Sequence, residues 1–189
     1  MQVLFLCTAN TGRSALAEAL FRARLAARGV PDVVVRSAGR LEAGVAPSPL
    51  VVEVAATYAA DLSAHRSTRL TADLLADADL VVPMAGEHRA DALALLPAAP
   101  PRTFLLRELA RLTARAGPRR PGEGLTAYLA RLDQLRGGGP DDARDDIADP
   151  YGQPVDVLWR TAAELDALAR DVTESWWPRS RECPPPARG

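Results

Sequence analysis

One short stretch near the amino terminus combines a thiol, a guanidinium and small loop residues at a spacing suited to phosphate chemistry. The apolar run at residues 3–6 ends in Cys7, five small or polar residues follow, and Arg13-Ser14 closes the stretch. A strand, a tight loop and a helix in this order point successive backbone N–H groups and a positive helix end at one anion. Only a thiolate is nucleophilic, and donors that bind a phosphate dianion also stabilise a thiolate at their centre. The pattern therefore predicts a cysteine-dependent phosphatase.

Each position of this loop suits a particular task. Arg13 has a planar fork that can bind two phosphoryl oxygens at once. Asn10 tolerates a left-handed backbone and can tie the loop together through its amide, while Gly12 permits a sharp turn. Ser14 can cap the following helix and hydrogen-bond the Cys7 sulfur, which eases departure of that sulfur as a leaving group. The residues expected to bind phosphate are Thr8, Ala9, Asn10, Thr11, Gly12, Arg13 and Ser14.

Alternating apolar and amphipathic segments predict the elements that position the loop. Short β-type runs are expected at residues 2–6, 32–36, 79–84 and 102–105. Helical patterns are expected at residues 14–28, 48–59, 71–77, 87–96, 107–115 and 155–175. Strands that alternate with helices predict the α/β class with a parallel sheet, and such sheets bind ligands at the carboxyl ends of their strands. The last helix is expected to bury Leu158, Ala162, Leu165, Ala169 and Val172.

Three stretches resemble the low-molecular-weight protein tyrosine phosphatase family. Residues 3–20, VLFLCTANTGRSALAEAL, are similar to its Cys-x5-Arg-Ser loop. Residues 36–39, RSAG, resemble its Ser-Ala-Gly segment, and residues 146–151, DIADPY, resemble its Asp-Pro general-acid loop. The likeness covers about residues 1–175, which we predict to be one domain. It implies a flavodoxin-like, doubly wound sheet of four parallel strands with helices on both faces, no cofactor and no metal.

The resemblance assigns roles to the Asp-Pro segment. Asp149 is expected to protonate the leaving oxygen and then, as a carboxylate, to activate the water that hydrolyses the phosphocysteine. Asp146 is the competing candidate for this role. Pro150 holds Asp149 extended, and Tyr151 is expected to form a wall on which an aromatic substrate ring stacks. The expected catalytic residues are Cys7, Arg13 and Asp149.

The substrate is less narrowly determined than the chemistry. Ala9 stands where the family usually has glycine, and Gly12 stands where a second cysteine is frequent, so a loop disulfide is lost but the catalytic residues are intact. We expect hydrolysis of protein phosphotyrosine. A bacterial branch that acts on phosphoarginine carries Thr at the position of Thr11, which makes a protein-arginine phosphatase the first alternative. A thiol-dependent arsenate reductase, suggested by Gly12, and a non-catalytic phosphate-binding module are the others.

Composition narrows the class of protein and its partners. The chain has 189 residues, of which 48% are hydrophobic and 25% charged, with a net charge of −1. This fits one globular domain and gives no basis for binding nucleic acid or an anionic membrane. We find no membrane span or signal peptide pattern, and two cysteines indicate a reducing cytoplasm. Abundant alanine and the absence of lysine suggest a bacterial, actinobacterial-like source.

We expect the partner to be a phosphorylated protein or a small phosphate ester, with a phosphate- or sulfate-like anion in the loop. The protein is expected to be a monomer or a weak dimer. Neither His65 nor His88 lies in a pattern that would activate the nucleophile, so both are expected to be structural or surface residues.

Residues 117–145 match the family least. Glycine and proline clusters flank leucines at helical spacing, and aspartates follow, namely Asp141, Asp142, Asp145 and Asp146. This segment is interpreted as an insertion near the active site. One alternative is a small helix packed on the body with solvated acids, and the other is a mobile cover whose acids disfavour acidic substrates. Residues 176–189 are expected to be a disordered, Pro-rich tail that contains Cys183, with Trp176-Trp177-Pro178 closing the last helix.

Overall fold

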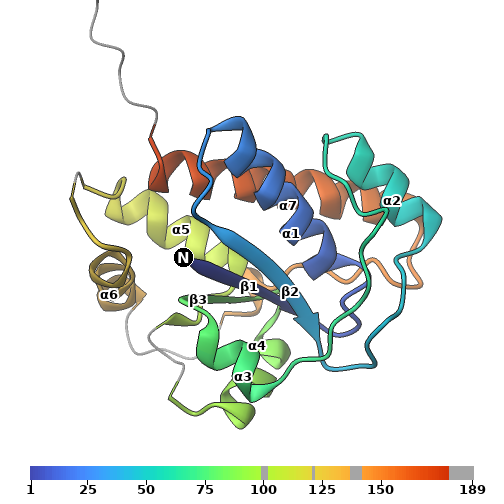
Figure 1. Ribbon diagram of the computed structural model, residues 1–189, viewed down its shortest axis with the longest axis horizontal. Helices are drawn as coiled ribbons and strands as arrows, with labels where there is room; N and C mark the ends of the chain where they lie inside the picture. The colour runs from blue at the N-terminus through green and yellow to red at the C-terminus, as the bar shows by residue number, and fades with distance from the viewer. Residues whose placement is uncertain (99–101, 121, 137–141, 179–189) are drawn as a thin grey trace, which may run out of the picture.

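A computed structural model describes residues 1–98, 102–120, 122–136 and 142–178, and it arranges them in three layers (Figure 1). The central layer is a parallel sheet in the order β2-β1-β3, with β1 at Gln2–Cys7, β2 at Val34–Gly39 and β3 at Leu80–Pro83. The helices are α1 (Arg13–Ala27), α2 (Pro49–Ala56), α3 (Ala72–Asp77), α4 (Gly86–Leu95), α5 (Leu106–Ala116), α6 (Leu125–Arg136) and α7 (Val155–Trp176). This confirms the predicted α/β class.

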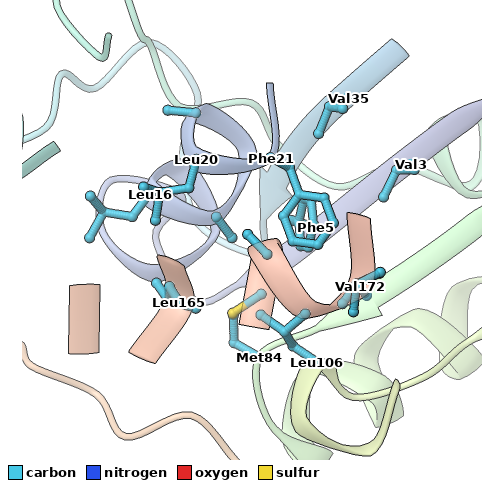
Figure 2. Packing of buried hydrophobic residues seen from close by; sticks show 14 of the residues in the cluster. Val3, Phe5, Leu16, Leu20, Phe21, Val35, Met84, Leu106, Leu165 and Val172 are labelled. Atoms are coloured by element: carbon cyan, nitrogen blue, oxygen red, sulfur yellow. The ribbon is translucent and has the colours of Figure 1, made fainter. Parts of the chain in front are cut away.

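The central strand β1 is apolar and buried from Val3 onward because helices cover both of its faces. Val3 and Phe5 belong to the larger hydrophobic cluster, where the Phe5 and Phe21 rings lie 4.8 Å apart and side chains of α1, α5 and α7 surround them (Figure 2). Leu4 and Leu6 point to the opposite face and pack with residues of α3 and α4. The alternation of side chains along a strand places Cys7 on the same face as Phe5.

The fourth strand predicted at residues 102–105 is not formed, and the described sheet has three strands. Thr103 forms an isolated parallel bridge with Val81, where the Phe104 N–H donates to the Val81 carbonyl at 3.0 Å. The next N–H, that of Leu105, donates to the Glu108 carboxylate at 3.0 Å, as at the start of a helix. The chain therefore turns into α5 before a ladder can extend.

The second strand lies later than the predicted residues 32–36. Its pairing with β1 runs from Gln2 opposite Val34 to Cys7 opposite Gly39, so the ladder of the buried central strand sets its limits. The final helix agrees closely with prediction, and its five predicted core residues are all buried. It continues to Trp176, one residue beyond the predicted domain boundary, and that buried indole belongs to the domain.

The helix in the poorly matched segment packs on the body of the domain. α6 buries Tyr128, Leu129 and Leu132, and the Tyr128 ring meets Trp176 edge-on at 5.4 Å. The Tyr128 hydroxyl donates to the Gly117 carbonyl at 3.0 Å. In Figure 1, α6 lies beside α5, away from the carboxyl ends of β1 and β2. The location near the active site that we predicted for this segment is therefore wrong for α6.

Two further predictions concern the tail of the chain and membrane spans. The predicted tail with Cys183 lies, from residue 179 onward, outside the described residues. Within the part of the chain that the structure describes, no helix is both long and apolar enough to cross a membrane.

The anchoring of α7 by Trp176 can be tested by truncating its side chain. The indole is 1% exposed and its Nε1–H donates to the Thr113 hydroxyl at 3.1 Å. Trp176→Ala is expected to lower the free energy of unfolding by about 3–5 kcal/mol, since it leaves a large cavity. The partly exposed neighbour Trp177 is the matched control, and Trp177→Ala is expected to cost less than about 2 kcal/mol. Urea unfolding followed by circular dichroism measures both, and equal losses would contradict the assignment.

Candidate active site

The predicted nucleophile lies at the carboxyl end of β1, where the chain enters the loop that leads to α1. Cys7 is buried, and its Sγ is 2.9 Å from the Ser14 hydroxyl. The backbone N–H of Asn10 donates to the same sulfur at 3.3 Å. Two hydrogen-bonding groups therefore surround the sulfur, and both stabilise a thiolate when they donate to it.

The side chain of Asn10 determines the direction of the hydrogen bonds in the loop. Its Oδ1 accepts the Thr68 N–H at 2.8 Å, and a backbone N–H can only donate. The Nδ2 must therefore donate, and it reaches the hydroxyls of Ser14 at 2.9 Å and Ser37 at 2.7 Å. Because the Ser14 oxygen already accepts this bond, its hydrogen is available for the Cys7 sulfur. Asn10 has a φ of 55° and is fully buried, in keeping with its predicted tolerance of a left-handed backbone.

A second layer of polar groups supports Asn10. The Ser37 hydroxyl donates to the Glu18 carboxylate, which also pairs with Arg22. His65 Nε2 lies 2.8 Å from the Asn10 carbonyl, so this nitrogen carries a hydrogen and donates it. His65, expected to be structural or a surface residue, therefore contacts the loop directly.

Gly39 is needed because the phosphate loop passes directly over it. A Cβ at this position would lie 2.7 Å from the Thr8 carbonyl oxygen and 2.8 Å from the Asn10 nitrogen. Both contacts are closer than real Cβ atoms approach backbone, so a side chain here displaces the loop. At Gly12, by contrast, a Cβ would meet nothing within 4 Å, and its φ of −130° is not left-handed.

The guanidinium of Arg13 and the carboxylate of Asp149 are in direct contact. Arg13 is buried, and its fork donates to the Ile147 carbonyl at 3.0 Å and to Asp149 Oδ2 at 2.5 Å. The second oxygen of Asp149 accepts the Tyr151 N–H at 3.1 Å. Asp146, the competing acid, instead accepts the Gly86 N–H at 2.8 Å at the start of α4. The geometry thus favours Asp149 over Asp146 as the acid beside the loop.

These groups share one cavity of about 540 Å³. Its lining combines loop residues, Asp149 and apolar side chains that include Leu50 and Val51. Tyr151 is 91% exposed at the rim. Of the residues predicted from sequence, those that line it are Cys7, Thr8, Ala9, Thr11, Gly12, Arg13, Asp149 and Tyr151. Asn10 and Ser14 are buried behind the loop and contact the sulfur instead.

His88 contacts the loop from α4, a contact that no sequence pattern indicated. Its Nε2 is 3.0 Å from the Thr8 hydroxyl, and its ring is 2% exposed. Burial, followed by the positive charge of Arg13, lowers the pKa of His88 to about 4 from its ordinary 6.5. His88 is therefore neutral near pH 7. The spacing of residues in the sequence does not reveal this contact, because His88 and Thr8 are 80 residues apart and only the fold brings them together.

The aspartates after α6 are engaged in local contacts. Asp142 pairs with Arg144 at 2.7 Å, Asp145 pairs with Arg111 at 2.6 Å, and Asp146 binds the Gly86 N–H. Asp141 lies outside the described residues. Among the residues described, no cluster of three or more histidine, cysteine or acidic side chains is arranged to hold a metal ion. The acids that are described thus have donors of their own, which weakens the predicted repulsion of acidic substrates.

Comparison with known proteins decides the family. The sequence model of the low molecular weight phosphotyrosine protein phosphatases matches residues 2–116, more than half of the chain. The chain belongs to this family. It is thus a hydrolase with the family's α/β fold, and the resemblance carried by the Cys7 loop is confirmed.

Relatives of this phosphatase are named either as protein-tyrosine phosphatases or as protein-arginine phosphatases. The chain is 34% identical to the probable low molecular weight protein-tyrosine-phosphatase EpsP of Ralstonia nicotianae, over 72% of this chain and 89% of that protein. It is 30% identical to the protein-arginine-phosphatase of Bacillus subtilis, over 92% of this chain and 95% of that protein. The crystal structure of a low molecular weight protein tyrosine phosphatase from T. tengcongensis superposes with a TM-score of 0.69 at 32% identity, covering 92% and 98% of the two chains.

The close approach at Gly39 predicts a strong effect of a single methyl group. Gly39→Ala is expected to lower kcat/KM for an aryl phosphate by about a hundredfold, because it displaces the backbone that positions the phosphate. Gly124→Ala is the control, since a Cβ there meets nothing within 4 Å and Gly124 lines a different cavity. An unchanged kcat/KM in folded Gly39→Ala protein would refute the steric argument.

The buried His88 predicts a specific dependence of stability on pH. The unfolded chain takes up a proton on this imidazole near pH 6.5, whereas the folded chain does so only near pH 4. Stability is therefore lost as the pH falls through this window. Between pH 7 and pH 4, the wild type is expected to lose about 2–3 kcal/mol more than His88→Asn. Urea unfolding at several pH values measures this difference, and parallel stability curves would contradict the prediction.

Proposed function

We propose that this phosphatase hydrolyses protein phosphotyrosine through a phosphocysteine intermediate. The observation that carries the proposal is the meeting of three groups in one cavity. The Cys7 sulfur has Ser14 and the Asn10 N–H beside it, and the Arg13 fork contacts Asp149 at 2.5 Å. A nucleophile, an anion-binding cation and an acid are the parts that phosphoryl transfer to cysteine needs.

The proposed cycle has two displacements. The Cys7 thiolate attacks phosphorus, the bond to the ester oxygen breaks, and the protonated Asp149 gives its proton to that oxygen. Water then attacks the phosphocysteine, Asp149 takes up its proton, and the thiolate leaves with phosphate as the other product. Arg13 and the loop N–H groups stabilise the phosphoryl charge in both steps. The Ser14 hydroxyl, directed by Asn10, stabilises the departing thiolate. No cofactor enters this cycle.

The walls of the cavity support an aromatic ester. Leu50, Val51 and Leu158 form an apolar side above the loop, and Tyr151 stands at the rim. A phenyl ring can lie against such a wall and stack on Tyr151 while its phosphate occupies the loop. These contacts favour phosphotyrosine over the smaller phosphoserine and phosphothreonine.

Phosphoarginine is the second candidate substrate. Thr11 lines the cavity beside Cys7 and Arg13, and its hydroxyl adds a polar group close to where the phosphoryl group binds. The relative named protein-arginine-phosphatase is similar along 92% of this chain. An arsenate reductase is less favoured, because Cys7 is the only cysteine in the described part of the chain and an external thiol is needed.

The proposed chemistry also bears on the cellular location and the partners of the protein. A catalytic thiolate requires a reducing compartment, which supports a cytoplasmic location. We propose that the protein works as a monomer or weak dimer, that a phosphate- or sulfate-like anion binds in the loop, and that its partners are phosphorylated proteins or small phosphate esters.

Parallel assays of phosphotyrosine and phosphoarginine peptides test the function. We expect tyrosine-selective turnover that Cys7→Ser abolishes. Asp149→Asn is expected to lower kcat by about 10²–10⁴-fold, the usual contribution of a general acid. Asp146→Asn is the matched control, since Asp146 binds a backbone N–H and is expected to leave kcat within about threefold.

Three results would change the assignment. Selective turnover of phosphoarginine favours the second candidate. A loss in Asp146→Asn that matches the loss in Asp149→Asn contradicts the role of Asp149. Folded, reduced protein that hydrolyses neither peptide contradicts both candidates, and arsenate with an added thiol is then the next substrate to assay.

A further inference from the structure

We infer that a second cavity beside the phosphate loop binds an acidic side chain of the substrate, next to the phosphorylated residue. This cavity has a volume of about 540 Å³, and its charged lining consists of Arg40, Arg69 and Glu42. The inference rests on the proposed function, because it concerns protein substrates of the same site.

The two cavities adjoin each other. Ala9, Thr11 and Leu41 line both, so the loop backbone and the Leu41 side chain form their common boundary. The Leu41 N–H donates to the Thr8 carbonyl at 3.2 Å, which attaches this boundary to the loop. A peptide whose phosphorylated side chain enters the catalytic cavity therefore has neighbouring residues within reach of the second one.

Arg69 is the least compensated cation of this cavity. The backbone of Arg69 forms a parallel bridge with Gly39 at the end of β2. In this bridge the Gly39 N–H donates to the Thr68 carbonyl at 2.9 Å, and the Leu70 N–H donates to the Gly39 carbonyl at 2.7 Å. The Arg69 side chain is exposed, and no carboxylate in the described ranges forms an ion pair with it. Its guanidinium donors are thus available to a ligand.

Arg40, the other cation of this cavity, is held by two acids of α4. Its guanidinium lies 3.6 Å from Glu87 and 3.6 Å from Asp91, and its side chain is 44% exposed. These separations exceed hydrogen-bond distance, so the two carboxylates orient Arg40 without occupying its donors. The flexible side chain therefore has a preferred position while it can still bind a carboxylate.

The acids around this cavity offset part of its positive charge, and in the described ranges none of them forms an ion pair with Arg69. Glu42 also lines the cavity, so its carboxylate opposes a second acid and limits the preference. The aspartates predicted to repel acidic substrates are paired elsewhere, Asp142 with Arg144 and Asp145 with Arg111. Because Arg40 is shared with Glu87 and Asp91, the preference for an acidic over a neutral ligand rests mainly on Arg69, and the effect of such exposed pairs is modest and sensitive to salt.

Matched phosphotyrosine peptides that carry Glu or Gln at the two positions on either side test the subsite. We expect the wild type to have a kcat/KM about two- to tenfold higher for the Glu peptides at low salt, and a smaller ratio in 0.5 M NaCl. Arg69→Gln and Arg40→Gln are expected to bring the ratio close to one, whereas Glu42→Gln raises it. Hydrolysis of a small aryl phosphate is expected to change less than about twofold in each variant, since that substrate does not reach the cavity.

Arg66→Gln is the charge-matched control, because Arg66 lies on the same segment but lines a different cavity. A ratio that falls equally in Arg66→Gln and Arg69→Gln reflects long-range charge and overturns the subsite. A ratio near one in the wild type also overturns it. If no phosphotyrosine peptide is hydrolysed, the proposed function fails instead, and the Glu-to-Gln ratio on phosphoarginine peptides then decides whether the subsite exists.

Discussion

The orientation of a single amide, that of Asn10, is the constraint on which the candidate site depends. The Thr68 N–H can only donate, so it fixes which end of the amide is oxygen, and the other end must then donate to Ser14 and Ser37. Because each serine oxygen accepts from Asn10, the Ser14 hydroxyl donates to the Cys7 sulfur and the Ser37 hydroxyl donates to Glu18. A carboxylate at this position cannot donate, so even an isosteric acid would reverse or break the chain of bonds.

The sheet contributes to the site by holding the loop from both sides. On one side, Cys7 pairs with Gly39, whose missing side chain lets the loop pass directly over β2. On the other side, β3 leads into α4, which presents His88 to Thr8. A neutral imidazole suits this place because Arg13 lies close by, and a second buried cation would be costly. The helix that follows β3 thereby supports the loop without adding charge to it.

The features that could be predicted from the sequence are those that a short segment determines by its own residues. The Cys7 loop, three of the four predicted strands, the predicted helices and the inward face of α7 each follow from a local pattern and are present. The strand predicted at residues 102–105 is reduced to a bridge with Val81, and how far a segment pairs with a distant strand is not specified by its own local pattern. The choice between Asp146 and Asp149 had the same difficulty, since both lie in one acidic run and only the fold brings Gly86 to the first and Arg13 to the second.

The same distinction separates the reaction from the choice of substrate. The groups proposed to do the chemistry lie mainly on one loop of eight residues, so their types and spacing specify the reaction class. The groups that would contact the rest of a substrate come from distant segments, with Leu41 after β2, Arg69 before α3 and Tyr151 before α7. No single stretch of sequence contains that arrangement. The contacts that we propose with the rest of a substrate therefore lie mainly at the rim, where changes are expected to alter substrate preference while the thiolate chemistry stays the same.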